Sequence, residues 1–425
     1  MTIHNTLSQL TNQCVMCGLC IPHCPTYQLF QTESESPRGR IALIKALAEE
    51  QLEITPGMVE ALDHCLACQA CEKMCPSQVD YSRINNLGRE LMARQSQTIR
   101  SSFKQKLAEK ALMSQSLHPL LKLATKILTP LQPLISSSSS LSAMGNFSRE
   151  MLADASAATP LKNAYSVPAP IGQVILFKGC SGDLFEQQVL TDSVMLLNAC
   201  GYNVIVPEKQ HCCGAIKLRH GDTRGMLAQA QQTIDDFNPW LTQSSALISV
   251  NNSCSGQLKD YERLPSYHDA DDSDGRQDLP GAHDIARKTS DIIAFLAKAL
   301  ATADVRFAPL EQEVAVHIPC SLKNVLKEVP LLFQLLQQIP GIRLKSLNDQ
   351  FCCGAAGSYM LRYPDVANRL LDGKIKDIMQ YQSQTIVSSN LGCTLHFKQG
   401  LEQQGQTVEV IHPIRLLARQ LIRED

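Results

Sequence analysis

The sequence lacks several features that would place it in common functional classes. Its 39 Lys and Arg residues nearly balance 41 Asp and Glu residues, and no long basic block occurs, so nucleic acid is a poor candidate partner. No run of about 18 apolar residues is present, which argues against a membrane-spanning helix. The start is polar, without a basic region followed by an apolar stretch, so we expect no signal peptide and a protein that faces the cytosol.

Motifs that bind common organic cofactors are missing as well. The chain has no Gly-x-Gly-x-x-Gly strand–turn–helix fingerprint and no phosphate-binding loop. Its 425 residues are enough for two or three domains, and 44% hydrophobic with 19% charged residues is an ordinary globular balance. We therefore expect flavin or nicotinamide chemistry to take place in another subunit.

Cysteine, in contrast, is abundant, and its spacing is regular. An odd count of 17 in a reducing compartment argues against a disulfide framework and indicates metal or redox chemistry. The run Cys14-x2-Cys17-x2-Cys20-x3-Cys24-Pro25 recurs 51 residues later, from Cys65 to Pro76. The second run has the same spacing, with its cysteines at Cys65, Cys68, Cys71 and Cys75.

This spacing is typical of two [4Fe–4S] clusters, in which the fourth cysteine of each run ligates the other cluster. One predicted ligand set is therefore Cys14, Cys17, Cys20 and Cys75. The other predicted set is Cys65, Cys68, Cys71 and Cys24. Structural zinc is the alternative, but this spacing is unusual for zinc, and two full copies, each with its proline, favour iron–sulfur.

A second cysteine repeat occupies the C-terminal half. It comprises Cys180, Cys212, Cys213 and Cys254 in one copy and Cys320, Cys352, Cys353 and Cys393 in the other. The first interval has 31 intervening residues in both copies, and the last has 40 and 39. Each copy collects thiols from the ends of separate predicted strands, which suits a cluster or another soft-metal site. Structural cysteines, or relics of a duplication that hold no metal, remain the alternative.

Other residues near these motifs have two interpretations each. His211, His317 and His396 lie beside the cysteines, where each could donate a hydrogen bond to a sulfur or be structural. Arg38 and Arg40 either lie near a cluster and raise its potential or pair with acids such as Glu33 and Glu35. Cys200 has no counterpart in the second copy and ends an apolar helix pattern, so we expect a core cysteine.

Hydrophobic periodicity predicts helices over 40–51, 81–94 and 189–197. It also predicts strands over 174–177, 203–206, 247–250, 314–316 and 385–387.

The predicted fold is multi-domain: a mainly helical ferredoxin-type domain (1–100) followed by two repeated α/β cysteine-rich units (173–300 and 301–425) with parallel strands. A helical segment and linker (101–172) join them. Its amphipathic part, 101–128, would pack in a core or dock on a partner or membrane surface. An exposed loop is expected over 269–284.

Together these motifs resemble, nearly end to end, the family of the iron–sulfur subunits of bacterial glycolate oxidase. The resemblance rests on Cys-Val-Met-Cys-Gly-Leu-Cys-Ile-Pro-His-Cys-Pro-Thr-Tyr from Cys14, Ser-Pro-Arg-Gly-Arg-Ile from Ser36, Cys-Leu-Ala-Cys-Gln-Ala-Cys-Glu from Cys65, His-Cys-Cys-Gly-Ala from His211, Cys-Cys-Gly-Ala-Ala-Gly-Ser-Tyr from Cys352 and Asn-Leu-Gly-Cys from Asn390. The C-terminal half also resembles the cysteine-rich domain of heterodisulfide reductases. Subunits of lactate oxidation systems and of anaerobic glycerol-3-phosphate dehydrogenase belong to the same wider group.

The resemblance implies an electron-transfer subunit of a flavin-dependent 2-hydroxy-acid dehydrogenase complex, with glycolate as the first candidate substrate. Such a subunit would hold two [4Fe–4S] clusters, with one or two more in the C-terminal repeats, and would carry no catalytic residues of its own. It would pass electrons from a flavin-containing partner subunit to a quinone or another membrane redox partner, at the inner face of the cell membrane. D-lactate dehydrogenase, glycerol-3-phosphate dehydrogenase and a heterodisulfide-reductase-like catalytic subunit are the alternatives.

One departure from the heterodisulfide reductase pattern bears on these alternatives. That pattern ends each repeat with Cys-x2-Cys, whereas here Asn251 and Asn390 occupy the first of the two positions. Four cysteines remain in each repeat. This disfavours a cluster that needs five thiolates, and with it disulfide-reducing chemistry.

Overall fold

The computed structural model describes residues 2–95, 118, 160–267, 279–348, 350–381 and 383–422. Apart from His118, the expected amphipathic helix over 101–128 lies outside the described residues, as does the linker up to residue 159. The expected exposed loop over 269–284 is described from residue 279 onward. The prediction is wrong at this end, because a helix begins at Ala282 and both Leu279 and Ala282 are buried.

The N-terminal part is helical, as predicted. Its helices are α1 (Ile3–Thr11), α2 (Pro25–Phe30), α3 (Pro37–Ala48), α4 (Pro56–Asp63), α5 (Ala70–Lys73) and α6 (Tyr81–Gln95), with short 3-10 turns η1 (Ile21–His23) and η2 (Glu33–Glu35). Helix α3 begins three residues before the predicted start because Ser36 caps it, accepting a hydrogen bond from Gly39 N, and Pro37 suits the first helical position. Apolar faces of α1, α3, α4 and α6 form one core around Leu7, Ile44 and Leu62.

The remaining chain forms two sheets built to one plan. The first contains β1 (Ala164–Tyr165), β2 (Gly172–Phe177), β3 (Tyr202–Ile205), β4 (Ala246–Ser249) and β5 (Thr289–Asp291), in the order β1-β3-β2-β4-β5. The second contains β6 (Glu313–Val316), β7 (Arg343–Ser346), β8 (Thr385–Val387) and β9 (Glu409–Ile411), in the order β7-β6-β8-β9. All pairings are parallel except β1 with β3, so β3-β2-β4-β5 and β7-β6-β8-β9 are equivalent. The five predicted strands are present, each shifted by at most two residues at either end.

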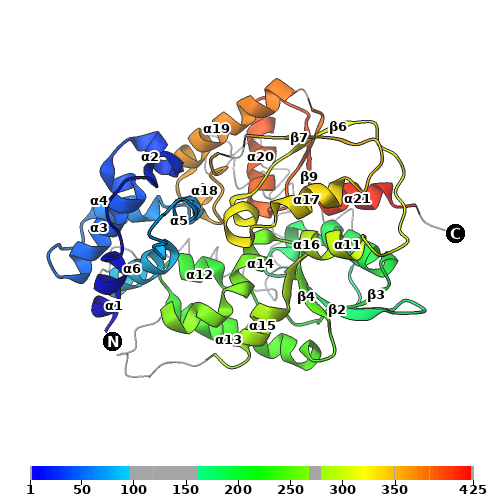
Figure 1. The fold of residues 1–425 in the computed structure, drawn as a ribbon, viewed down its shortest axis with the longest axis horizontal. Helices are drawn as coiled ribbons and strands as arrows, with labels where there is room; N and C mark the ends of the chain where they lie inside the picture. Colours follow the sequence, from blue (N-terminus) through cyan, green and yellow to red (C-terminus); the bar gives the residue numbers. More distant parts are fainter. Residues whose placement is uncertain are drawn as a thin grey trace.

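Helices cover both sheets. The first unit has α10 (Gly182–Phe185), α11 (Gln187–Ala199), α12 (Ala215–Arg219), α13 (Thr223–Leu241), α14 (Asn252–Lys259), η5 (Tyr261–Tyr267), α15 (Ala282–Lys288) and α16 (Ile292–Ala299). The second has the π-helical η6 (Ser321–Leu326), α17 (Val329–Leu336), α18 (Tyr359–Arg362), α19 (Pro364–Tyr381), α20 (Leu391–Gln403) and α21 (Pro413–Gln420). Figure 1 shows the helical part at one end of the molecule, beside both units.

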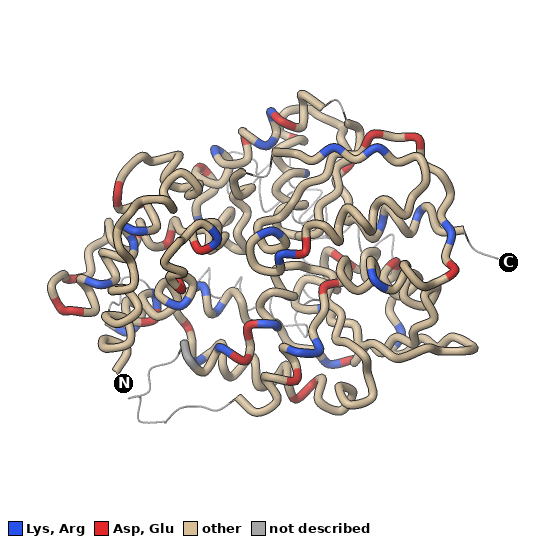
Figure 2. Tube along the Cα trace, in the orientation of Figure 1, with Lys and Arg blue, Asp and Glu red and all other residues tan. Residues whose placement is uncertain are grey.

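The two units share a buried core. Along β2, Val174 and Leu176 face this shared core, whereas Ile175 and Phe177 face a second core under α13 and α15. Strand β6 alternates in the same way, with Val314 and Val316 in the shared core. Burial on both faces explains why these strands are continuous apolar runs in the sequence. Figure 2 shows the charges of both signs intermixed along the trace.

Contact between the helical part and the first unit is very close at one turn. Gly221 follows α12 with φ +73°, and a Cβ placed on it would lie 2.6 Å from the backbone oxygen of Arg89 in α6. A side chain here meets both a left-handed backbone and a rigid neighbour.

We therefore expect Gly221→Ala to lower the free energy of unfolding by about 1–3 kcal/mol, because it overpacks this contact. Urea unfolding of the anaerobic protein measures the change. Gly57→Ala is the matched control, because a Cβ there would meet nothing within 4 Å, and its stability should stay equal or rise slightly. Equal stability of both variants would contradict a rigid contact at Gly221.

Candidate metal centres

The two ferredoxin-type loops have the same backbone path. The first lies between α1 and η1, and the second between α4 and α5. Left-handed residues occur at matching places in both, at Met16 and Gly18 in the first loop and at Ala67 and Gln69 in the second. Three of these four are not glycine, and such strain persists where the surroundings fix a functional loop. The repeated spacing therefore produces a repeated three-dimensional loop.

The first loop and the end of the second motif line one small cavity of about 40 Å³. Cys14, Cys17, Cys20 and Cys75 all line it, so it gathers the four residues predicted as one ligand set. Cys71 and Pro76 line it as well. Cys17 is exposed, and the neighbouring Val15, Met16 and Leu19 are exposed apolar residues. This centre therefore lies at the protein surface.

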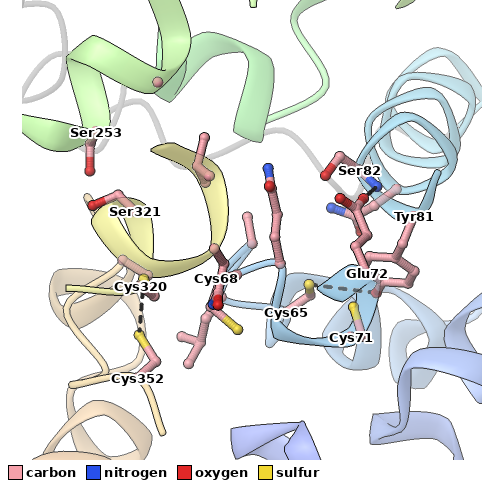
Figure 3. Close-up of a pocket in the computed structure, with 18 of the residues that line it drawn as sticks. Cys65, Cys68, Cys71, Glu72, Tyr81, Ser82, Ser253, Cys320, Ser321 and Cys352 are labelled. Carbon is pink, nitrogen blue, oxygen red and sulfur yellow. Dashed lines mark hydrogen bonds between the residues drawn. The ribbon is translucent and has the colours of Figure 1, made fainter. Parts of the chain in front are cut away.

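The second set lies deeper, in a cavity of about 930 Å³ between the helical part and both sheet units. Cys65, Cys68, Cys71 and Cys24 all line it. So do Cys320, Cys352, Cys353 and Cys393 of the second unit. Figure 3 shows Cys68 between Cys65 and Cys71 on one side and Cys320 and Cys352 on the other. Two predicted thiol sets therefore face the same cavity.

A buried ion pair stands beside this cavity. Arg40, 1% exposed, donates to Glu35 Oε2 at 2.6 Å and to Thr26 Oγ1 at 2.9 Å, and its Nη1 lies 3.7 Å from Cys24 Sγ. Glu35 also contacts His64 Nδ1 at 2.6 Å. Arg40 thus pairs with an acid, as in one of its two interpretations, and its charge also lies beside a predicted ligand. Arg38, which is more exposed, pairs with Glu33 at 2.7 Å and donates to Met16 O in the first loop.

Side chains from both sheet units fix the second loop. Arg219 of α12 donates to Cys65 O at 2.7 Å, and Asn324 of η6 donates to Cys68 O at 2.7 Å. Just before the loop, Asp63 accepts from Arg89 at 2.8 Å and from Arg362 of α18 at 2.7 Å. These residues were not found from the sequence, because nothing in their local patterns distinguishes them from surface residues.

The surroundings shift the pKa values of these thiols in different directions. Burial raises the pKa of Cys71 well above its ordinary value, and it does the same for the pKa of Cys68, with Cys352 adding to the effect. Burial alone would also raise the pKa of Cys65, but the charges of Arg40 and Arg89 lower it overall. Since metal ligands must be thiolates, binding would release protons here.

In both repeats the four cysteines also converge. Each set lies beyond the ends of three strands, β2, β3 and β4 in the first unit and β6, β7 and β8 in the second. In the second repeat the sulfurs of Cys320 and Cys352 are 4.0 Å apart, and those of Cys353 and Cys393 are 2.8 Å apart. In the first repeat the thiols of Cys180 and Cys254 contact those of Cys212 and Cys213. All seventeen cysteines lie in the described residues, and none of them forms a disulfide.

Asn251 and Asn390, which stand where the heterodisulfide reductase pattern has a cysteine, have a structural role. Asn251 caps α14 by accepting from Ser253 N at 3.1 Å, and Asn390 caps α20 by accepting from Cys393 N at 3.3 Å. The amide nitrogen of Asn390 donates to Ser253 and Ser321 hydroxyls. Each side chain therefore orders the helix that carries the last cysteine of its repeat.

The three histidines near the cysteines differ in their contacts. His211 pairs with Asp236 at 2.6 Å, and His396 contacts the carbonyl oxygen of Cys353 at 3.0 Å. Burial lowers the pKa of His396 to about 4, so its ring is neutral at pH 7. His317 has a ring nitrogen within 4.8 Å of the sulfurs of Cys353 and Cys393. Cys200 is 3% exposed in the shared core, and burial raises its pKa to about 12, as for a packing cysteine.

The donor chemistry fits iron–sulfur clusters. Thiolates are the ligands that such clusters use, and the four thiols of each N-terminal set, like those of the second repeat, line a common cavity. Cations at Arg40 and Arg89 suit an anionic occupant of the second cavity. In the part of the chain that the structure describes, no helix is long and apolar enough to cross a membrane.

The Arg40 pair gives a stability prediction. Arg40→Gln leaves Glu35 buried without its cation, which should cost about 3–5 kcal/mol of unfolding free energy. Urea unfolding under anaerobic conditions measures it. Arg38→Gln, which removes an exposed ion pair five residues from its acid, is the control and should change stability little. A similarly small loss in the Arg40 variant would show that this pair is not needed for the fold.

Comparison with known proteins agrees with the two-part organisation. A family described as "4Fe-4S dicluster domain" matches residues 10–79, and one described as "Cysteine-rich domain" matches residues 174–259 and 314–398. The first range contains all eight cysteines of the N-terminal motifs, and the other two contain one repeat each.

Relatives cover nearly the whole chain. The glycolate oxidase iron–sulfur subunit of Escherichia coli (strain K12) is 28% identical over 97% of this chain and 94% of its own length. The probable glycolate oxidase iron–sulfur subunit of Bacillus subtilis (strain 168) is 28% identical over 95% and 92%. Lactate utilization protein A of Shouchella clausii (strain KSM-K16) is 28% identical over 57% of this chain and 98% of its own length. The chain therefore contains one 4Fe-4S dicluster domain and two cysteine-rich domains and is similar over nearly its whole length to glycolate oxidase iron–sulfur subunits.

Proposed function

We propose that this chain is the electron-transfer subunit of a flavin-dependent 2-hydroxy-acid dehydrogenase complex, with glycolate as the first candidate substrate. The observation that carries the proposal is the arrangement of thiols: a surface set and a buried set share the second loop, and the buried set faces a third. Such a chain of centres suits the movement of electrons between two partners. The names of the near full-length relatives supply the substrate class.

In this proposal each cluster has four cysteine ligands. Cys14, Cys17, Cys20 and Cys75 hold the surface cluster, and Cys65, Cys68, Cys71 and Cys24 hold the buried one. When bound, a [4Fe–4S] cluster accepts and returns one electron at a potential that its surroundings set. The chain contributes the surroundings: Arg40 beside Cys24 favours the more reduced, more negative state of the buried centre.

The second cysteine-rich repeat is the proposed site of a further cluster. Cys320, Cys352, Cys353 and Cys393 share their cavity with Cys68. The first repeat has the same four cysteines, but none of them lines the cavity that contains Cys68, so a structural role is the alternative for this repeat. We propose the same domain limits as above: a ferredoxin-type domain over 1–100, a helical segment and linker over 101–172, and the two cysteine-rich repeats over 173–300 and 301–425.

The proposed partners follow from what the chain contains and from its relatives. A flavin-containing dehydrogenase subunit would remove hydride from the substrate, and its docking surface would be the exposed apolar rim of the surface centre at Val15, Met16 and Leu19. A quinone or another membrane redox partner would receive the electrons, with the chain peripheral at the inner face of the cell membrane.

Lactate is the second candidate substrate, because a relative named lactate utilization protein A matches 57% of this chain. An iron–sulfur subunit of a glycerol-3-phosphate dehydrogenase would have the same role, but none of the relatives named above carries that name. Disulfide reduction by the cysteine-rich repeats is less well supported, since Asn251 and Asn390 serve as helix caps where a fifth thiolate would be needed.

Metal content tests the number of centres. Two clusters predict about eight irons and eight acid-labile sulfides per chain, and a third raises this to about twelve, at four irons per cluster. Anaerobic iron and sulfide analysis with low-temperature EPR of the dithionite-reduced protein provides the count. Twelve supports the third centre, eight limits the chain to the ferredoxin-type pair, and zinc without sulfide would reject the iron–sulfur assignment.

Loss of one thiol tests the function. Cys68→Ser should remove about four irons and block substrate-driven reduction of the membrane acceptor by the complex, while the flavin subunit still reduces an added dye. Cys200→Ala is the control: it removes a buried cysteine that lies in the shared core, so iron content and turnover should persist. Full turnover with the native acceptor in the Cys68 variant would refute the electron-transfer role.

A further inference from the structure

A histidine shares the small volume occupied by two thiols of the second repeat. A ring nitrogen of His317 and the sulfurs of Cys353 and Cys393 all lie within 4.8 Å of one another, and all three residues are buried. His317 also lines, with Cys320 and Cys352, a cavity of about 280 Å³. The imidazole is therefore part of the wall around the repeat's four cysteines.

The ring is held in a fixed orientation. His317 directly follows β6, and its backbone N–H donates to Val387 O in β8 at 3.0 Å. Its Nδ1 lies 2.9 Å from Ser388 Oγ, and the ring packs edge-on against Phe397 at 4.7 Å between centroids. A hydrogen bond at one ring nitrogen orients the imidazole and sets its tautomer, as such bonds do for metal-ligating histidines.

The internal duplication shows that packing alone does not require this histidine. Phe177 stands at the equivalent place in the first repeat, three residues before Cys180, as His317 stands three residues before Cys320. Phe177 packs against Phe237 at 5.7 Å between centroids and is 1% exposed. An aromatic ring fills both positions, but a buried imidazole carries polar nitrogens that need partners, which phenylalanine avoids.

We propose that His317 is a nitrogen ligand of the iron held by the second repeat, which is thus a centre with four cysteines and one histidine. The inference rests on the proposed function, because it requires metal at this repeat. As a fifth ligand, neutral imidazole adds no negative charge, whereas a fifth thiolate would, so the potential of the centre is higher than that of a centre with five thiolates, in the direction that histidine ligation has in other iron–sulfur centres. The two repeats would then differ in chemistry as well as in position.

The decisive experiment detects the nitrogen directly. Full-length protein labelled with ¹⁵N-histidine, purified anaerobically and partly reduced, is compared with unlabelled protein by pulsed EPR. The expected result is an isotope-dependent nitrogen coupling that His317→Phe abolishes. His317→Cys should keep the iron but lose the coupling and lower the midpoint potential, since a thiolate replaces a neutral donor.

Two controls separate the possible failures. His211→Phe alters a histidine beside Cys212 in the first repeat, so the coupling should remain. Cys353→Ser should lower the iron count by up to about four. If that count is unchanged, the second repeat holds no iron, and both the third centre and the ligand role of His317 are rejected. If Cys353→Ser loses iron but wild type shows no histidine coupling, or His317→Phe keeps it, the third centre stands and the ligand proposal alone is overturned.

Discussion

The loop from Cys65 to Cys71 is held in place by hydrogen bonds that come from both cysteine-rich repeats. Arg219 binds the carbonyl oxygen of Cys65, and Asn324 binds that of Cys68. Because these bonds go to the backbone, they fix the loop without occupying its sulfurs. The position of Cys68 beside Cys352 follows from them. If the loop moved away, the buried and the third thiol sets would no longer face one cavity, so the proposed function depends on these contacts.

The same region gathers more positive charge than a protein interior usually tolerates. Arg40, Arg89 and Arg219 are buried or nearly so, and burial together with Arg89 lowers the pKa of Arg219 to about 10. Asp63 and Glu35 offset part of this charge, since each forms short ion pairs. Buried ion pairs by themselves contribute little net stability, because desolvation opposes the attraction between charges. An anionic cluster would complete the balance, which gives the cations a reason to lie where they do.

Spacing in the sequence was enough to locate every thiol set, because a repeated motif specifies a repeated loop or strand end. Strands buried on both faces were found for a similar reason: Val174 to Phe177 is a continuous apolar run. Edge strand β7 was missed, since Arg343–Ser346 is mostly exposed and has no apolar pattern. The residues that hold the second loop were missed because their partners are far away in sequence: Asn324 is 256 positions from Cys68. Such contacts exist only after the domains have packed.

One helical domain packed against two copies of the same unit cannot offer both copies the same surroundings. The second copy places its cysteines in the cavity that contains Cys68, whereas the first contributes Arg219 and a buried core around Cys212 and Cys213. Once the copies were placed differently, equivalent positions were free to diverge. Phe177 corresponds to His317, and His211 corresponds to Phe351, so the histidine near the thiols precedes Cys212 in the first copy and Cys320 in the second. The strand order shows the shared origin of the repeats, and the side chains at these two positions show where their roles separated.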